Sequence, residues 1–283
     1  MISGALVLEG GALRGVYVSG VLDVFMEADI EFEYVLGVSA GAVNAVNYVS
    51  KQIGRSAKIN IDHVNDTEYM GWKHLLKSGG IFNFDFLFGE GAEKIMPYDE
   101  EAFMRSQQRC VIGATNCLTG RQKFFERDTY QELGEALKAS CTLPVLSRLV
   151  DIDGTPYTDG GVSNGIPFKK AQKEGYQKVV LILTRPKGYR ARDNWLLHPV
   201  FQACYRKYPA LIKKLHTMTM RYNKILQQID ELERRRKVFV IRPTSRLQVK
   251  RIERNQNKLR LLYLEGKEDA RKLLPQMMDY LSK

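Results

Sequence analysis

A serine between two glycines is the residue with the clearest chemical potential in this chain. The segment Gly37-Val-Ser39-Ala-Gly41 has the spacing G-x-S-x-G and lies between an apolar run (32–36) and a helical pattern (42–49). A tight turn from a strand into a helix strains the serine, and the flanking glycines leave room for it. Its hydroxyl then lies above a helix N-terminus, which favours negative charge. Ser39 is therefore a candidate nucleophile, and the alternative is an ordinary glycine-rich turn.

A second glycine-rich stretch, Glu9-Gly10-Gly11-Ala12-Leu13-Arg14-Gly15, also separates an apolar run from a helical pattern. Glycines let the backbone approach a ligand and point its amides at an anion. One candidate anion is a phosphate, although the loop matches neither of the phosphate-binding patterns G-x-x-x-x-G-K-[ST] and G-x-G-x-x-G. Another is the oxyanion that develops during acyl transfer, which each hydrogen-bond donor would stabilise by about 3–4 kcal/mol. A third interpretation is a turn without a ligand. Arg14 would fix the loop or add positive potential.

An activated serine needs a proton acceptor. Asp159-Gly160-Gly161 follows a predicted strand, so its carboxylate would project into a crevice, although Asp-Gly is also a common turn dipeptide. None of the four histidines fits the chain order Ser–Asp–His of an α/β-hydrolase triad. They are His63, His74, His198 and His216. We expect these histidines to be surface or packing residues and Asp159 to be the partner of Ser39.

Short apolar runs alternate with helical patterns through the first 190 residues, which predicts βα units and a mainly parallel sheet. Strands are predicted at 5–8, 32–36, 110–114, 123–125, 149–152, 156–158 and 178–183, and helices at 16–25, 42–49 and 130–139. The dipeptides Thr119-Gly120 and Asp153-Gly154 predict hairpin turns. Residues 200–236 and 255–282 are helical in period and flank a predicted strand at 238–241. We therefore expect an α/β core at 1–190 and a basic, mostly helical extension at 191–283, docked on that core.

The composition is typical of a globular protein. Of 283 residues, 44% are hydrophobic and 27% are charged, which argues against disordered, collagen-like and coiled-coil classes. No apolar run approaches the roughly 20 residues of a membrane span. The four cysteines are sparse and lack a usual zinc spacing, so we expect a cytoplasmic protein without metal or cofactor.

The net charge of +11 is concentrated in the last third of the chain. Residues 200–283 hold 21 Lys and Arg against 8 Asp and Glu, with the densest run at Arg234-Arg-Arg-Lys237. Such a face attracts nucleic acid, anionic lipid or an acidic partner, or is simply solvated. Because no nucleic-acid-binding signature accompanies it, we expect no nucleic acid partner and consider peripheral contact with an anionic membrane. The oligomeric state stays open.

One aromatic segment has two interpretations. Ile81-Phe-Asn-Phe-Asp-Phe-Leu-Phe88 lies between glycines and is dense in phenylalanine. It would be a core hairpin, which we favour, or a mobile apolar lid over an acyl groove.

These motifs together resemble the patatin-like phospholipases. The matching pieces are the loop Gly10 to Gly15, the elbow Gly37 to Gly41, Ala139-Ser-Cys-Thr-Leu-Pro144, and Asp159-Gly-Gly161 with Asn164 and Pro167, within residues 4–185. Residues 243–266 also resemble the C-terminal extension of a bacterial subgroup. The resemblance implies a three-layer α/β/α fold and a Ser–Asp dyad without histidine.

Carried over to this chain, the resemblance implies that Ser39 is the nucleophile and Asp159 its base. The backbone of Gly10, Gly11 and Ala12 would form the oxyanion hole, with Ala12 in place of the family's usual third glycine. Supporting positions would be Arg14, Gly15, Gly37, Gly41, Gly160 and Gly161. The implied activity is hydrolysis of fatty acyl esters of (phospho)lipids through an acyl-enzyme. A thioesterase or acyltransferase with the same dyad, and a non-catalytic lipid-binding regulatory protein, are the alternatives.

Overall fold

The computed structural model describes residues 1–71, 73–74, 80–87, 89–128, 133–245 and 248–283. These residues form an eight-stranded sheet in the order β5-β6-β3-β2-β1-β7-β8, with β4 paired to β3 off this path. The strands are β1 (Ile2–Leu8), β2 (Phe32–Val38), β3 (Arg109–Asn116), β4 (Gln122–Glu126), β5 (Val150–Ile152), β6 (Thr155–Asp159), β7 (Val179–Ile182) and β8 (Phe239–Ile241).

The sheet is mostly parallel. The pairs β1–β2, β1–β7, β2–β3 and β7–β8 are parallel, whereas β3–β4, β3–β6 and β5–β6 are antiparallel. Parallel strands bring their carboxyl ends to one edge of the sheet, so the loops that follow β1 and β2 lie side by side there. The predicted mainly parallel α/β fold is confirmed.

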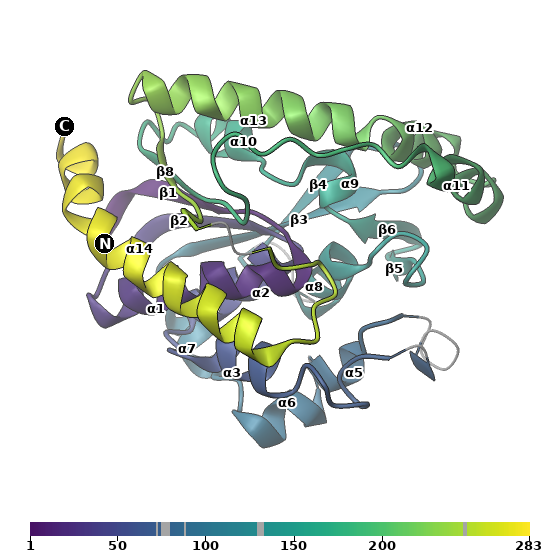
Figure 1. Ribbon diagram of the computed structural model, residues 1–283, viewed down its shortest axis with the longest axis horizontal. Helices are drawn as coiled ribbons and strands as arrows, with labels where there is room; N and C mark the ends of the chain where they lie inside the picture. The colour runs from purple at the N-terminus through teal and green to yellow at the C-terminus, as the bar shows by residue number, and fades with distance from the viewer. Residues whose placement is uncertain (72, 75–79, 88, 129–132, 246–247) are drawn as a thin grey trace.

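Helices cover both faces of the sheet (Figure 1). The longer helices are α1 (Val16–Glu27), α2 (Ala40–Val49), α3 (Arg55–Asp62), α8 (Leu133–Cys141), α12 (Pro209–His216), α13 (Met218–Arg234) and α14 (Gln256–Ser282). The shorter ones are η1 (Ala12–Gly15), α5 (Phe84–Leu87), α6 (Glu90–Ile95), α7 (Glu100–Arg105), α9 (Gly161–Asn164), α10 (Phe168–Lys173), η2 (Trp195–Leu197) and α11 (His198–Cys204). Among the described helices, none is long and apolar enough to cross a membrane.

Successive side chains of each strand enter different cores, which produces the three layers. Leu6 and Leu8 of β1 join the core under α1, α2 and α14, whereas Val7 joins the core under α10 and α13. This alternation is the period of two expected of a strand that is buried on both faces. Residues 130–132, at the start of the predicted helix 130–139, lie outside the described residues.

The C-terminal extension contributes to both the sheet and one helical layer. Strand β8 pairs with β7, and α14 lies along α1 (Figure 1). The two helices approach closely because each has a glycine at the crossing: a Cβ on Gly20 would lie 2.2 Å from the Tyr263 carbonyl oxygen, and one on Gly266 would lie 2.3 Å from the Tyr17 carbonyl oxygen. Tyr17 also donates a 2.8 Å hydrogen bond to Asp269. Whether residues 1–190 and 191–283 are separate domains stays a prediction.

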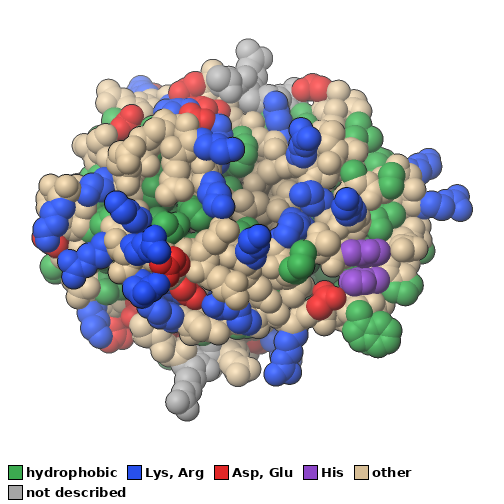
Figure 2. Space-filling model, turned by 90° about the horizontal axis from the view of Figure 1, so that it is seen from above, with side chains coloured by type: hydrophobic (Ala, Val, Ile, Leu, Met, Phe, Trp, Pro, Cys, Tyr) green, Lys and Arg blue, Asp and Glu red, His purple; other side chains and the backbone are tan. Residues whose placement is uncertain are grey.

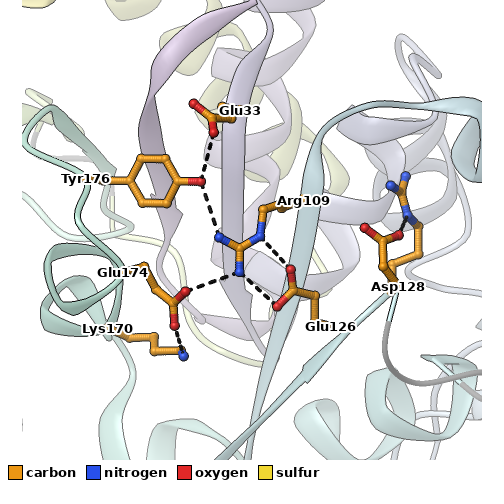
Figure 3. Close-up of polar contacts among 8 residues, drawn as sticks. Glu33, Arg109, Glu126, Asp128, Lys170, Glu174 and Tyr176 are labelled. Atoms are coloured by element: carbon orange, nitrogen blue, oxygen red, sulfur yellow. Dashed lines mark hydrogen bonds and ion pairs between the residues drawn. The ribbon is translucent and has the colours of Figure 1, made fainter.

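An ion-pair network stabilises the start of β3 (Figure 3). Arg109 pairs with Tyr34 of β2, four residues before Val38, which precedes Ser39. Arg109 makes two hydrogen bonds to the carboxylate of Glu126, of 2.6 and 3.1 Å, and one of 3.2 Å to Glu174. The hydroxyl of Tyr176 lies 3.4 Å from both Arg109 and Glu33. The network joins β3 and β4 to the turn before β7, and we assign it a structural role.

Candidate active site

Ser39 occupies a strained turn between β2 and α2. Its backbone angles are φ 55° and ψ −128°, in a region that costs a non-glycine residue about 1–3 kcal/mol. The neighbouring glycines let the turn pack tightly: a Cβ on Gly37 would lie 2.3 Å from the Gly41 carbonyl oxygen, and one on Gly41 would lie 2.4 Å from that of Leu8. The strained strand-to-helix elbow expected from the sequence is therefore present.

The structure brings Ser39 and Asp159 into direct contact. The Ser39 hydroxyl donates a 2.8 Å hydrogen bond to Oδ2 of Asp159, and both side chains are buried. Asp159 is the last residue of β6, and its Oδ1 accepts a 2.7 Å hydrogen bond from the amide of Gly161. Its carbonyl oxygen accepts a hydrogen bond from Thr115 on β3. Both ends of the aspartate are thus fixed, with one carboxylate oxygen left for the serine.

The environment of Asp159 makes its carboxylate more basic than an exposed one. Burial raises the pKa of this carboxyl to about 6, because the charged form loses its hydration. Hydrogen bonds from Ser39 and from the Gly161 amide, and the positive charge of Arg251, act in the opposite direction. A carboxylate near its reference pKa of about 4 is a weak base towards a hydroxyl, so the raised pKa makes Asp159 a better one.

The loop after β1 lies against the elbow. A Cβ on Gly10 would lie 2.9 Å from the Cβ of Ser39, so the backbone at this position lies against Ser39. Among the described residues, the amides of Gly10, Gly11 and Ala12 donate to no protein acceptor. Ala12 has φ 49°, which turns the chain into η1. Buried or half-buried amides without acceptors are available to an anion, as an oxyanion hole requires.

A polar network holds this loop in place. Asn44 of α2 donates a 2.9 Å hydrogen bond to the carbonyl oxygen of Gly15, and its own side-chain oxygen accepts hydrogen bonds from Ser19 and Ser56. On the other side, the amide of Leu13 donates to the carbonyl oxygen of Arg251 in the C-terminal extension.

Arg14 is buried at the same edge of the sheet. Its Nε and Nη1 atoms have no hydrogen-bond partner among the described residues. Burial lowers the pKa of this guanidinium to about 10, as do the nearby positive charges of Arg185 and Arg251. Glu9 opposes this shift and is itself held by Thr184 and Tyr222. Three guanidinium groups with few counter-charges create a positive potential beside the elbow.

Each histidine has contacts away from Ser39. His63 pairs with Asp66, and a ring nitrogen of His74 lies 2.6 Å from the carbonyl oxygen of Thr67. His198 and His216 stack on each other, with ring centroids 4.3 Å apart. In the described part of the chain, no group of three or more His, Cys, Asp or Glu side chains could hold a metal ion.

An apolar cavity of about 890 Å³ begins at Ser39. Its walls come from α2, α3, α8 and the short helices between residues 84 and 105, and they include Val43, Ile59, Phe82, Phe84, Leu137 and Leu143. The size falls in the usual range of small-molecule sites. Within the aromatic segment 81–88, Ile81 and Phe82 are buried, and Phe82, Phe84 and Leu87 line the cavity, so this part of the segment forms a wall. Phe88 lies outside the described residues.

Ser140 belongs to the motif at residues 139–144, but the sequence alone indicated no role for it. Its hydroxyl accepts a 2.7 Å hydrogen bond from the amide of Ser39 and donates a 2.8 Å hydrogen bond to the carbonyl oxygen of Gly113. Ser140 thus ties α8 to the elbow and to β3. The available signal was a polar residue next to the buried, apolar residues Ala136, Leu137 and Ala139 of this helix. Gly160 and Gly161 follow Asp159 at the start of α9.

Comparison with known proteins gave matches along most of the chain. A family model described as patatin-like phospholipase matches residues 6–171, and a second model, described as a domain of unknown function, matches residues 208–282. The uncharacterized protein YjjU of Escherichia coli (strain K12) is 28% identical over 255 residues, which cover 86% of this chain and 69% of YjjU. The probable lipid hydrolase 463L of Invertebrate iridescent virus 6 is 26% identical over 189 residues, covering 59% of this chain and 63% of 463L.

A similar solved structure is that of VipD from Legionella pneumophila, with a TM-score of 0.49 and 12% identity, covering 96% of this chain and 67% of VipD. The phospholipase model alone spans more than half of the 283 residues and includes both Ser39 and Asp159. The chain therefore belongs to the patatin-like phospholipase family.

Proposed function

We propose that the protein is a serine acyl hydrolase that cleaves fatty acyl esters of phospholipids and related lipids, with Ser39 as nucleophile and Asp159 as base. The observation that carries the proposal is the 2.8 Å hydrogen bond between Ser39 Oγ and Asp159 Oδ2 at the end of an apolar cavity. Membership of the family supports a lipid ester as the substrate.

The reaction would run in two halves. Asp159 accepts the hydroxyl proton while Ser39 Oγ attacks the ester carbonyl, and the amides of Gly10, Gly11 and Ala12 stabilise the oxyanion. When the tetrahedral intermediate collapses, the alcohol leaves with the proton from Asp159 and the acyl group stays on Ser39. Asp159 then takes a proton from water, which attacks the acyl-serine, and the fatty acid is released as the proton returns to Ser39.

The surroundings of Ser39 offer an apolar cavity for the acyl chain of a phospholipid and positive charge for its headgroup. The cavity walls offer the acyl chain an apolar environment, and its transfer from water would provide binding free energy. The unpartnered guanidinium atoms of Arg14 suit a negatively charged headgroup.

The test combines covalent labelling with product analysis. A fluorophosphonate probe should react with the native protein, because the Ser39 oxygen bonds to phosphorus as fluoride leaves and Asp159 takes the hydroxyl proton, and it should not label Ser39→Ala. Phospholipid vesicles incubated with the native protein should yield free fatty acid and lysophospholipid in equal amounts, as measured by mass spectrometry. An unlabelled native protein would refute the proposal, and so would labelling without fatty acid release, since it would indicate transfer to an acceptor other than water.

Ser140 is a positioning residue in this proposal, and its removal should affect turnover more than binding. In Ser140→Ala, the Ser39 amide loses its acceptor and the strained turn can relax, so kcat should fall about 10-fold while KM changes little. The measurement is steady-state hydrolysis of a soluble ester.

Ser50→Ala is the matched control, because Ser50 is equally buried and donates to the Val46 carbonyl oxygen at the far end of α2. It should lose comparable stability, about 1–3 kcal/mol, without loss of kcat. Equal kcat values in the two variants would show that Ser140 only stabilises the fold.

A further inference from the structure

Four large apolar side chains are exposed together where the C-terminal extension begins. Trp195, Leu196 and Leu197 of η2 are 69%, 64% and 40% exposed, and Val200 of α11 is 37% exposed. Single exposed apolar residues are normal on a soluble protein, but a cluster that includes a tryptophan marks a contact surface. We call these four residues the apolar tip.

The part of the chain that carries the apolar tip is rich in cations. Residues 185–221 contain nine Lys and Arg and a single acidic residue, Asp193. Figure 2 shows Lys and Arg side chains spread across the face that carries α13, and hydrophobic side chains beside two neighbouring histidines. Four exposed cations form no ion pair with any described residue. These tip cations are Arg192, Arg206, Lys207 and Lys213.

The densest cationic run of the sequence, Arg234 to Lys237, is partly paired with acidic side chains. Arg234 and Arg235, at the end of α13, both pair with Glu231. Helix α13 has 17 residues and is about 25 Å long, and α11 and α12 lie beyond its first residue. Arg234 and Arg235 therefore lie at the opposite end of α13 from the apolar tip (Figure 1). Arg236 and Lys237 of the same run are exposed and form no ion pair with a described residue, so the run stays cationic. What distinguishes the tip is the exposed tryptophan and leucines of its apolar cluster.

The apolar tip is attached rigidly to the catalytic edge of the sheet. Phe201 and Tyr205, which follow it, are buried in a core shared with Val162 of α9, the helix that begins beside Asp159. The hydroxyl of Tyr205 accepts a 2.7 Å hydrogen bond from the amide of Val145, two residues after Leu143 in the cavity wall. A surface that engages the tip would therefore hold the catalytic edge close to it.

We propose that the apolar tip and the tip cations dock the protein on an anionic lipid bilayer. Tryptophan and leucine side chains insert at the boundary between headgroups and acyl chains, and nearby Lys and Arg side chains add attraction to anionic lipids. The arrangement favours a bilayer over a protein groove, because the apolar side chains are exposed on a 3-10 turn and the first turn of a short helix, and because the adjoining segments supply the four exposed tip cations. This inference deepens the proposed function, on which it rests, by naming the surface that meets the lipid.

Vesicle binding by Ser39→Ala protein tests the proposal without any contribution from catalysis. Ser39→Ala should bind vesicles of phosphatidylglycerol and phosphatidylcholine at least 10-fold more tightly than vesicles of phosphatidylcholine alone, and higher salt should weaken the binding. The chain has two tryptophans, so Trp72→Phe in the same background leaves Trp195 as the sole indole reporter. Its fluorescence should shift to the blue when anionic vesicles are added.

Paired charge reversals locate the surface. Arg206→Glu with Lys207→Glu should weaken vesicle binding at least 10-fold, whereas Arg234→Glu with Arg235→Glu, the same change of charge, should weaken it less than 3-fold. Trp195→Ala with Leu196→Ala should reduce binding to a similar degree as the first pair, and thermal unfolding verifies that each variant is folded.

Three results would overturn the proposal. One is equal loss of binding in the two charge-reversal pairs, and another is an unchanged Trp195 spectrum on vesicles that bind the protein. The third is a blue shift that grows with protein concentration in the absence of lipid, which would assign the tip to self-association. None of these results depends on whether Ser39 and Asp159 catalyse hydrolysis.

Discussion

We expect Ser39→Ala and Asp159→Asn each to lower the hydrolysis of a soluble p-nitrophenyl ester by about 10⁴-fold. The first change removes the oxygen that we propose to attack, and the second replaces the carboxylate that accepts the Ser39 hydrogen bond among the described residues. Residues that act as one unit are not additive, so the double variant should be no slower than either single variant. Steady-state kinetics on the purified proteins provides the measurement.

The controls separate chemistry from folding. Asp153→Asn makes the same chemical change at an exposed turn position, where φ is 52° and asparagine is well tolerated. It should retain full activity. All variants should unfold in a cooperative transition, monitored by circular dichroism. If Asp159→Asn retained more than a tenth of the native rate, another group would have to be the base.

The rate falls steeply as the pH drops below 6. Asp159 must be ionised to accept the proton, and burial raises the pKa of its carboxyl to about 6. The ionised fraction at pH 4 is about one hundredth, so kcat/KM should fall about 100-fold between pH 7 and pH 4. Samples quenched into alkaline buffer allow nitrophenol release to be measured at every pH. A profile that is flat down to pH 5 would contradict this assignment.

The same ionisation should reduce stability at neutral pH. The folded protein holds the proton on Asp159 more tightly than the unfolded chain, whose carboxyl has an ordinary pKa of 3.8. The stabilisation that comes from the tighter binding of this proton in the folded state is fully present below about pH 4 and is lost as the pH rises through about 6. Relative to Asp159→Asn, the native protein should lose about 3 kcal/mol over this range. Urea unfolding of both proteins at pH 4 and pH 7 would reveal the difference.

Local sequence signals predicted most of the sheet and the elbow. The apolar runs at 32–36 and 110–114 are β2 and β3, and Asp153-Gly154 joins β5 to β6, because each pattern reflects local burial or a turn with a preferred backbone shape. The motif around Ser39 was visible because the elbow needs glycines at fixed spacing. Its contact with Asp159, 120 residues later, was expected by elimination and from the resemblance.

The remaining features depend on contacts between distant segments, which local patterns do not encode. The helices α3, α5, α6 and α7, which contribute to the cavity wall, have only four to eight residues each, too few for a periodic apolar pattern to identify them from the sequence. Ser140 gained a role only when α8 was placed against the elbow. Likewise, the density of cations pointed to Arg234, but the structure shows that pairing with Glu231 neutralises part of that charge. The cavity wall, the role of Ser140 and the pairing of Arg234 therefore depend on which residues are neighbours in space rather than in sequence.

The glycine crossing of α1 with α14 has a consequence for biosynthesis. Helix α1 leaves the ribosome among the first 30 residues, whereas its packing partner begins at residue 256. Until then the face of α1 with Tyr17 and Gly20 has no cover, and β7 lacks its neighbour β8. Domains generally fold as units during synthesis, so the nascent chain must stay soluble with an unfinished interior until β8 and α14 have been synthesised. A stalled or prematurely terminated chain would be a substrate for chaperones and proteases.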